Sequence, residues 1–526
     1  MKKKINKMNA ISILVALIHT IITFFTDKMI FELNSINIIN YYFCKVLVFV
    51  ILVLFWRFVF KTIFKRSNDN IKYVKYFLIY ILPMVVVLFL IWPGVWYGDD
   101  VYNFFNYAIN TEYLYYLNYI STVFYIIGFM IFPCTSGAII LQTILFGIIC
   151  SYIVKNCFDI FKNKLVYLLY VPFFLFHTIF YTFFANRPIM YGICYLFLIM
   201  YLIIENKKNN DFNFKKLIFI SFVTAVVGFW RSESIYLIVA IPIFVFLIYH
   251  LKFNIKNILK IGGVFIISFI IIALPQKIEE HRNDTGVPSS RNLPMFVSPL
   301  SYMLTQGLTG DNLDVDLENI DKVLDIKLMT KYGSYTDTPA IWNEGGCIKK
   351  YTSDEYNLFL KSYINVMKNN FPLFLKTKTF TFANASGVYI DNYSSKNLYN
   401  DDNDMLFERS DSKALFGYKV RQSTLKIIEG KFRDGQDTNI IYRLFGNFLI
   451  PMAFIGIIFV CSILKKNLFY FLISGMLIGH SCILFFTAPA SYFMYYFNVY
   501  LCGWIIFIYL VIIYLFNKSR KRSDLQ

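Results

Sequence analysis

Long apolar stretches alternate with short polar segments along most of the chain. A transmembrane α-helix needs about 20 apolar residues to cross a hydrocarbon layer of about 30 Å. The stretches that reach or approach this length lie at about 8–26, 41–63, 72–92, 137–154, 165–184, 188–204, 217–230, 235–250, 260–275, 444–463, 467–487 and 494–516. We therefore expect an all-α polytopic membrane protein with about 12 transmembrane helices.

One long segment, at about residues 276–443, is hydrophilic and long enough to fold by itself. Within it, apolar residues recur at helical spacing over 314–328 and 353–385, with Ser353 and Asp354 as an expected helix start. The remaining stretches are rich in turn residues. The pattern predicts three regions: helices 1 to 9 in residues 1–275, including an acidic outer loop at 93–136; a mixed, mainly helical extracytoplasmic loop domain at 276–443; and helices 10 to 12 with a basic cytoplasmic tail at 444–526.

The composition excludes a soluble protein. Of the 526 residues, 57% are hydrophobic and only 16% are charged, which is more apolar surface than a soluble core of this size buries. The nine cysteines lie mostly inside apolar stretches and predict no disulfide framework. The sequence contains no phosphate-binding glycine loop, dinucleotide motif or Cys/His metal cluster.

The formal charge of +18 is carried mainly by the short segments between the apolar stretches. Cytoplasmic loops of membrane proteins are enriched in Lys and Arg, and all these segments fall on one side if the apolar stretch 119–133 does not cross. We therefore expect a cell-membrane protein with both termini in the cytoplasm and residues 276–443 outside. The stretch 119–133 is then an interfacial helix on the outer surface. This charge pattern does not indicate nucleic-acid binding.

A doubled acid stands at the outer end of the third apolar stretch, in "WPGVWYGDD" at 92–100. Pro93 and Gly94 are expected to end the helix, so that Asp99 and Asp100 emerge at the membrane surface. A carboxylate there can act as a general base on a hydroxyl group or hold a divalent cation against a phosphate. The alternative is that one of the acids caps the following helix.

Arg187, Arg231 and Glu233 also border predicted spans on the outer side. A guanidinium group is always charged and binds phosphate through two parallel hydrogen bonds, which suits it to a lipid phosphate. The alternative is that each arginine anchors its helix among the lipid headgroups. For Arg231 a further alternative is that it neutralises Glu233, two residues away.

An aromatic run, "SYFMYYFNVY" at 491–500, begins the last predicted span. Tyr492 and Tyr495 are candidates for stacking on a sugar or lining a lipid groove. An aromatic belt at the membrane interface explains the run equally well.

These outer-face motifs together resemble the GT-C superfamily of membrane glycosyltransferases. "PGVWYGDD" is similar to the Pro-Gly, four residues, Asp signature in the first outer loop of an uncharacterised bacterial polytopic family. Asp99 matches the family acid, whereas Asp100 stands where serine is usual. "GFWRSESIYL" at 228–237 is similar to the family's Arg-Asn-Asn-Gly turn, with Arg231 retained and the asparagines lost. No second acid is found near Arg187, which leaves metal dependence open.

The resemblance implies an inverting sugar transfer from a polyprenyl-phosphate donor to a glycan or glycolipid of the bacterial cell envelope. Asp99 would take the proton of the acceptor hydroxyl, and Arg231 with Arg187 would hold the leaving phosphate. A divalent cation at Asp99 is the only cofactor that the pattern suggests. Partners are therefore lipid-linked sugars, polysaccharide acceptors and membrane lipids.

Two other functions fit the same pattern. A polysaccharide polymerase or ligase of the O-antigen type also has about a dozen spans and a large outer loop, but it would not need Asp99. A transporter or flippase would carry ionisable residues inside its spans. Such residues are sparse in the predicted spans, with Arg57 as the main exception.

Overall fold

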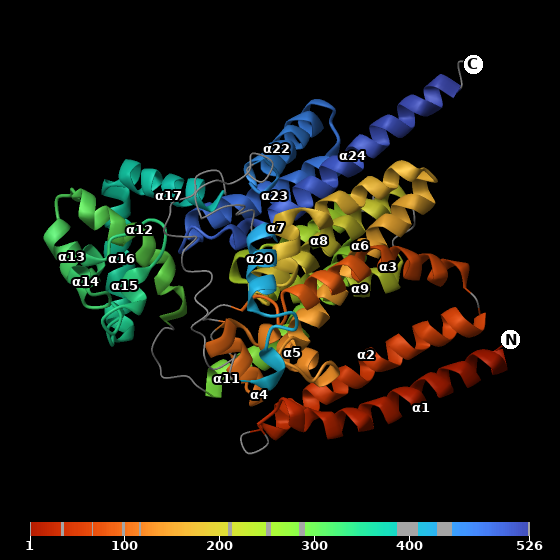
Figure 1. Cartoon of the computed structure of the whole chain (residues 1–526). Coiled ribbons are helices and arrows are strands. Elements are labelled where there is room, and N and C mark those ends of the chain that lie inside the picture. Colours follow the sequence, from red (N-terminus) through yellow and green to blue (C-terminus); the bar gives the residue numbers. More distant parts are fainter. Residues whose placement is uncertain are drawn as a thin grey trace. The chain divides into compact units, whose positions relative to one another are not determined.

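The structure is a computed structural model in which the described residues form helices and no β-strand, apart from two isolated bridges (Figure 1). It describes the chain except residues 1, 33–35, 66, 97–99, 115–116, 209–212, 249–253, 283–289, 387–408, 429–443 and 524–526, and except the side chains of residues 2–7, 65, 100–102, 291 and 520–523.

The chain divides into two compact units, each built from segments that are not continuous in the sequence. Unit 1 comprises residues 1–272, 399–446 and 500–526, and unit 2 comprises 273–398 and 447–499. The predicted regions follow one another along the chain, whereas unit 2 joins most of the predicted loop domain to two later apolar helices.

Unit 1 contains most of the apolar helices. Its main helices are α1 (Lys2–Thr26), α2 (Ile38–Lys65), α3 (Asn68–Leu90), α5 (Tyr119–Ile131), α6 (Gly137–Phe161), the pair η4 (Lys164–Phe174) and α7 (Phe176–Thr182), α8 (Arg187–Lys207), α9 (Phe214–Trp230), α10 (Leu237–Ile248), most of α11 (Ile255–Arg282), α20 (Tyr418–Ile428) and most of α24 (Phe497–Ser523).

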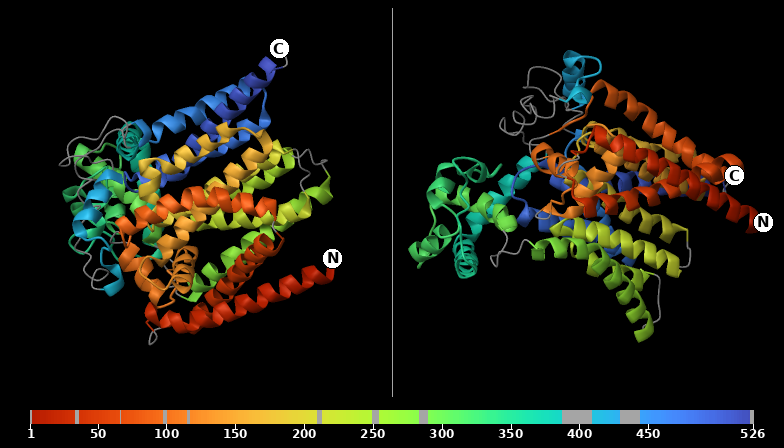
Figure 2. Two further views of the ribbon diagram at one scale, coloured as in Figure 1. Left: turned by 45° about the vertical axis from the view of Figure 1, so that its right-hand side comes forward. Right: turned by 90° about the horizontal axis from the view of Figure 1, so that it is seen from below.

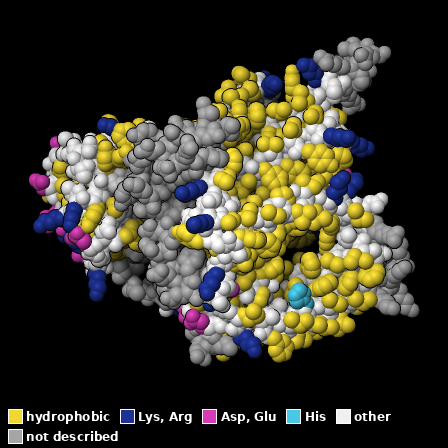
Figure 3. Space-filling view, in the orientation of Figure 1, with side chains coloured by type: hydrophobic (Ala, Val, Ile, Leu, Met, Phe, Trp, Pro, Cys, Tyr) yellow, Lys and Arg dark blue, Asp and Glu magenta, His cyan; other side chains and the backbone are white. Residues whose placement is uncertain are grey.

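Within the described residues, eight helices are long and apolar enough to cross a membrane, or nine if the bent pair η4 and α7 counts as one span. The chain is therefore a helical, multi-pass membrane protein. The burial of these helices differs widely: 89% of the apolar window of α8 is buried, against 22% for α1, α2 and α11. Hydrophobic side chains accordingly cover a broad band of the exposed helices (Figure 3), as expected of a surface that faces lipid.

The helix predicted to lie on the outer surface, α5, is instead buried on nearly all sides. Its 13 residues span about 20 Å, too short to cross a bilayer. However, ten of the 13 residues are buried, and the helix packs against α2, α4 (Asn106–Ile109) and α6. A helix that is apolar all round belongs in a protein interior, whereas an interfacial helix needs a polar face. The expected exposed, amphipathic helix is therefore not found, whereas its depth in the membrane stays a prediction.

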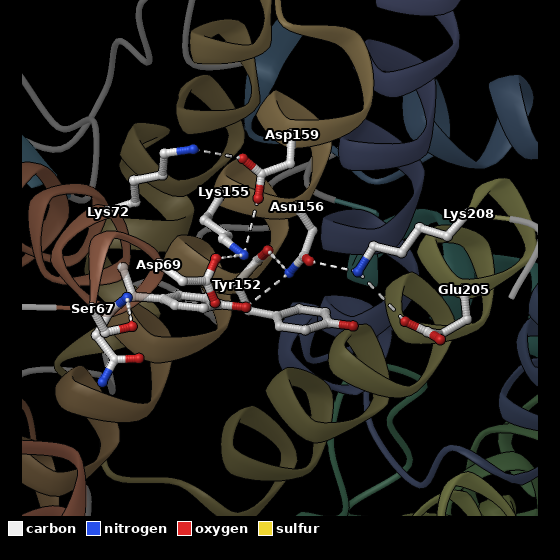
Figure 4. Close-up of polar contacts among 11 residues, drawn as sticks. Ser67, Asp69, Lys72, Tyr152, Lys155, Asn156, Asp159, Glu205 and Lys208 are labelled. Carbon is white, nitrogen blue, oxygen red and sulfur yellow. Dashed lines mark hydrogen bonds and ion pairs between the residues drawn. The ribbon is translucent and has the colours of Figure 1, made fainter. Parts of the chain in front are cut away.

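Polar contacts join the helices of unit 1 at the end where α3 and α9 begin and α6 and α8 finish, which we call the lysine end (Figure 4). Lys155 of α6, only 6% exposed, pairs with Asp69 of α3 and with Asp159 at 2.9 Å. The neighbouring Asn156 accepts a hydrogen bond of 2.7 Å from Lys208, just beyond α8. These contacts fix three helices relative to one another.

A second ion pair lies inside the hairpin of α1 and α2, which run side by side (Figures 1 and 2). Asp27 follows α1 directly and is 1% exposed; its carboxylate pairs with Lys45 of α2 and accepts a hydrogen bond from Tyr41. Lys45 lies within a predicted span, so the expectation that Arg57 was the main charge in the spans was incomplete.

Unit 2 combines a small helical domain with two apolar helices, α22 and α23. Its main helices are α12 (Leu293–Gln306), α13 (Leu313–Asp321), α14 (Ile326–Lys331), α15 (Pro339–Trp342), α16 (Ser353–Asn369), α17 (Phe371–Ala385), α22 (Leu449–Leu464) and α23 (Leu468–Thr487), followed by the short η8 (Phe493–Tyr496).

The start of α16 confirms the helix predicted at Ser353. Thr352 and Glu355 form a capping box, in which each side chain bonds the backbone of the other residue. The buried face of α16 contributes Phe359 and Val366 to an apolar core shared with α12, α13 and α14. This pattern explains why the predicted loop domain folds although its surface is polar.

Candidate functional site

The Pro-Gly turn of the predicted acidic loop packs closely on another turn of unit 1. Gly94 has φ +99°, and a Cβ atom there would clash with the side chain of Ile139 and approach the Phe183 carbonyl. The next residue, Val95, donates a hydrogen bond of 2.9 Å from its backbone N to the Phe183 carbonyl and pairs with Phe184 as an isolated bridge. Glycine is needed here because only it adopts this conformation in so little space.

The doubled acid itself is only partly described. Asp99 lies outside the described residues, and Asp100 is described by its backbone alone, which begins the π-helical turn Asp100–Phe105. Their roles as base, cation ligand or helix cap therefore stay predictions.

Aromatic rings fix this π-helical turn on α5. Phe104 stacks on Tyr125 with ring centroids 5.5 Å apart, and Phe105 meets Phe129 edge to face at 5.3 Å. Trp96, just before the doubled acid, contacts both Phe105 and Tyr125. The residues before and after the doubled acid therefore both pack on α5.

The start of α5 also holds the turn that carries Arg231. The side chain of Asn118 donates a hydrogen bond of 2.7 Å to the Phe229 carbonyl, and Trp230 donates one of 2.9 Å from its indole Nε1 to Ser121. Both contacts join residues more than 100 positions apart. The buried end of α9 is therefore anchored on α5.

The turn that carries Arg187 is held on the same helix. Tyr125 donates a hydrogen bond from its hydroxyl to the Ala185 carbonyl, and Arg187 donates one of 2.6 Å from Nη1 to the Leu117 carbonyl. The structure thus gathers three predicted elements of the site around α5: the acid-bearing loop, the Arg187 turn and the Arg231 turn. We call this the arginine end of unit 1, opposite the lysine end.

Arg231 and Glu233 form a buried ion pair at this end. Arg231 is 7% exposed, its Nε bonds a Glu233 carboxylate oxygen, and its guanidinium lies 6.0 Å from the ring centroid of Tyr191. Glu233 therefore neutralises Arg231, which was one of the alternatives for this residue. Arg187, at the start of α8, is half-buried.

Two residues of the predicted loop domain, Asp411 and Arg421, hold the Pro-Gly turn and its surroundings through hydrogen bonds that the sequence did not predict. We call these two residues the clasp. The Asp411 carboxylate accepts hydrogen bonds of 2.7 and 2.8 Å from the backbone N and hydroxyl of Thr135, and its carbonyl accepts one of 2.7 Å from Trp92. Arg421 of α20 donates a hydrogen bond of 3.2 Å to the Gly94 carbonyl. No local pattern marks these residues, since they are 276 to 327 positions from their partners.

The clasp affects the acidity of Asp411. Burial raises the pKa of Asp411, but the hydrogen bonds from Thr135 and the charge of Arg409 outweigh it, so the pKa lies below its ordinary value. Asp411 thus stays ionised as an acceptor.

Tyr492 and Tyr495 belong to unit 2, whereas the arginine end belongs to unit 1. Their rings contact each other at a centroid distance of 6.0 Å, and both side chains are half-buried. They remain candidates for a sugar or lipid contact in their own unit.

Among the described residues, no three His, Cys, Asp or Glu side chains come together as metal ligands. The candidate cation ligand, Asp99, lies outside these residues. No family model, curated protein or solved structure matches the chain.

Proposed function

We propose that the protein is a GT-C-like membrane glycosyltransferase with about 12 spans and both termini in the cytoplasm. In this proposal it moves a sugar from a polyprenyl-phosphate donor to a cell-envelope acceptor outside the cell membrane. Residues 276–443 form the extracytoplasmic loop domain, and the arginine end of unit 1 faces outward.

One observation carries the proposal: three segments that are distant in sequence converge on α5. They are the loop bearing Asp99 and Asp100, the Arg187 turn and the Arg231 turn. Acid and guanidinium groups at one end of a helical bundle are what a transfer from a membrane-anchored phosphate donor requires.

In the proposed reaction, Asp99 accepts the proton of the acceptor hydroxyl as its oxygen attacks the anomeric carbon of the sugar. The bond between that carbon and the phosphate oxygen breaks, and its electron pair leaves with the polyprenyl phosphate. Arg187 holds this phosphate, because the half-buried guanidinium is the more exposed of the two arginines. Arg231, paired with Glu233, positions the turn behind it.

The test is a set of matched acid-to-amide substitutions in the full chain. Asp99→Asn should slow release of polyprenyl phosphate from a polyprenyl-phosphate sugar by a factor on the order of 10² or more. Asp100→Asn should cost clearly less, and Asp311→Asn, at an exposed acid of unit 2, should leave the rate unchanged. Full activity in folded Asp99→Asn protein would remove this residue from the mechanism and favour a polymerase or ligase.

A chelator tests whether the reaction needs a divalent cation. If Asp99 holds a divalent cation, a chelator should abolish activity in the wild-type protein, and added cation should restore it. A base that acts without metal predicts no effect of the chelator.

A transporter or flippase is the second candidate, and the buried pair of Asp27 and Lys45 favours it. Ionisable groups inside transmembrane hairpins commonly mark transport pathways. A double variant that removes both charges, stays folded and keeps sugar transfer would argue against this role.

A further inference from the structure

The helix α20 and the turn before it carry basic side chains without acidic neighbours in sequence. Residues 412–428 contain no Asp or Glu, and their basic residues are Lys413, Lys419, Arg421 and Lys426. The three lysines are exposed, and none of them makes a hydrogen bond or ion pair with the described residues. These exposed cations are therefore available to a negatively charged partner.

Two adjoining sides of α20 are exposed, one basic and one apolar. Lys419 and Lys426 are seven residues apart and lie on one side of the helix, because seven residues make about two turns. Val420 and Ile427, each one position later, form the adjoining side and are also exposed. Figure 3 shows Lys and Arg side chains in a row over α20, with hydrophobic side chains beside them.

The turn that precedes α20 adds two large apolar side chains to this surface. Leu415 is 56% exposed and Phe416 is 60% exposed. Exposed apolar side chains next to lysines are typical of an amphipathic segment at the boundary between water and lipid. The apolar groups enter the lipid there, while the long lysine side chains keep their ammonium groups at the level of the headgroups.

The contacts of the clasp hold this surface at the end of a candidate span. Arg421 bonds the carbonyl of Gly94, four residues after α3 ends at Leu90, and Trp92 bonds the Asp411 carbonyl. The helix α3 is a candidate span, and α20 packs on α3 and α7. It runs across α3 rather than along it (Figures 1 and 2). A helix that crosses the end of a span lies along the membrane surface, where the lipid headgroups are found.

From this geometry we propose that α20 and the turn before it bind the surface of an anionic bilayer. Leu415, Phe416 and the apolar side of α20 enter the headgroup region, and Lys419 and Lys426 bind lipid phosphates. The partner is the surrounding membrane, whose lipids thereby hold the clasp on the Pro-Gly turn. The inference rests on the membrane-spanning helices of unit 1 and not on sugar transfer, so either proposal can fail without the other.

The experiment measures amide hydrogen exchange of residues 413–428 in the full-length protein, reconstituted in nanodiscs of neutral phosphatidylcholine or of anionic phosphatidylglycerol. A lysine close to an anionic surface strengthens binding about fivefold. Exchange in the wild-type protein should therefore be about fivefold or more slower in phosphatidylglycerol, because bound lipid opposes local opening. The difference should shrink at high salt, since salt screens exposed charges.

Matched double variants test the two lysines. Lys419→Gln combined with Lys426→Gln should remove most of the difference between the two lipids. The control combines Lys361→Gln with Lys368→Gln, at exposed lysines that are also seven residues apart, on α16 of unit 2. The control should keep the difference. Both double variants lose the same charge, so an effect of net charge alone would appear in both.

A third variant tests the apolar contact. Leu415→Ser combined with Phe416→Ser should speed the exchange of α20 in both lipids, and exchange as slow as in the wild type would contradict the proposal. The proposal is also overturned if the lysine double variant keeps the full difference between the lipids. Wild-type exchange that is equal in the two lipids would overturn it as well, and slow exchange of this kind would favour a protein partner.

Discussion

The buried pair of Asp27 and Lys45 allows a quantitative prediction about the α1 and α2 hairpin. The Asp27 carboxylate is contacted by the Lys45 ammonium and the Tyr41 hydroxyl. The ammonium has more neighbours: it also bonds Thr23 at 2.9 Å and lies 4.7 Å from the ring centroid of Phe24 and 5.5 Å from that of Tyr41. Removing either charge therefore leaves the other in a different environment.

These environments set the order of the effects. Lys45→Met leaves a buried carboxylate with one hydroxyl donor and should destabilise the fold by about 3–5 kcal/mol. Asp27→Asn leaves an ammonium group that keeps a hydroxyl and two ring faces, so the loss should be lower, about 2–3 kcal/mol. The double variant buries no charge, and we expect it within about 1 kcal/mol of the wild type.

The assay is a double-mutant cycle on full-length protein in one detergent, with unfolding followed by intrinsic fluorescence. Lys61→Met, at an exposed lysine of the same helix, is the control and should change stability by less than about 0.5 kcal/mol. Additive losses in the double variant would refute the coupling. A larger loss for Asp27→Asn than for Lys45→Met would refute the role given to the aromatic rings.

Two further predictions concern the Pro-Gly turn and its clasp. Gly94→Ala should destabilise the protein by about 1–3 kcal/mol in thermal unfolding, because the φ of +99° and the side chain of Ile139 leave no room for a methyl group, whereas Gly262→Ala, with open space around it, should not. Asp411 has a lowered pKa, so its stabilisation is present above the unfolded-state pKa of about 3.9 and is lost as the pH falls through the folded-state value. Asp411→Asn should therefore be less stable than the wild type at pH 7, with the difference narrowing below about pH 4; a difference independent of pH would contradict this.

Local patterns in the sequence determined the helices of this protein. The described parts of the apolar stretches are largely helical, because apolar residues in runs of this length favour a helix irrespective of their neighbours in space. Of the twelve predicted spans, eight helices, or nine with the bent pair η4 and α7, are long and apolar enough to cross a membrane within the described residues. The start of α16 was also predictable, because Thr352 and Glu355 act on each other within one turn. The composition likewise sufficed for the membrane class.

Only the tertiary structure decided which polar groups meet. The sequence left three interpretations of Arg231: it binds a phosphate, anchors its helix in the membrane, or neutralises Glu233. In the structure Arg231 lies beside the ring of Tyr191 and forms a buried ion pair with Glu233. The clasp of Asp411 depends on contacts across hundreds of residues. A side chain's spacing along its own helix says nothing of the distant surface that covers it, and that surface determines whether its charge is paired, solvated or left open to a ligand.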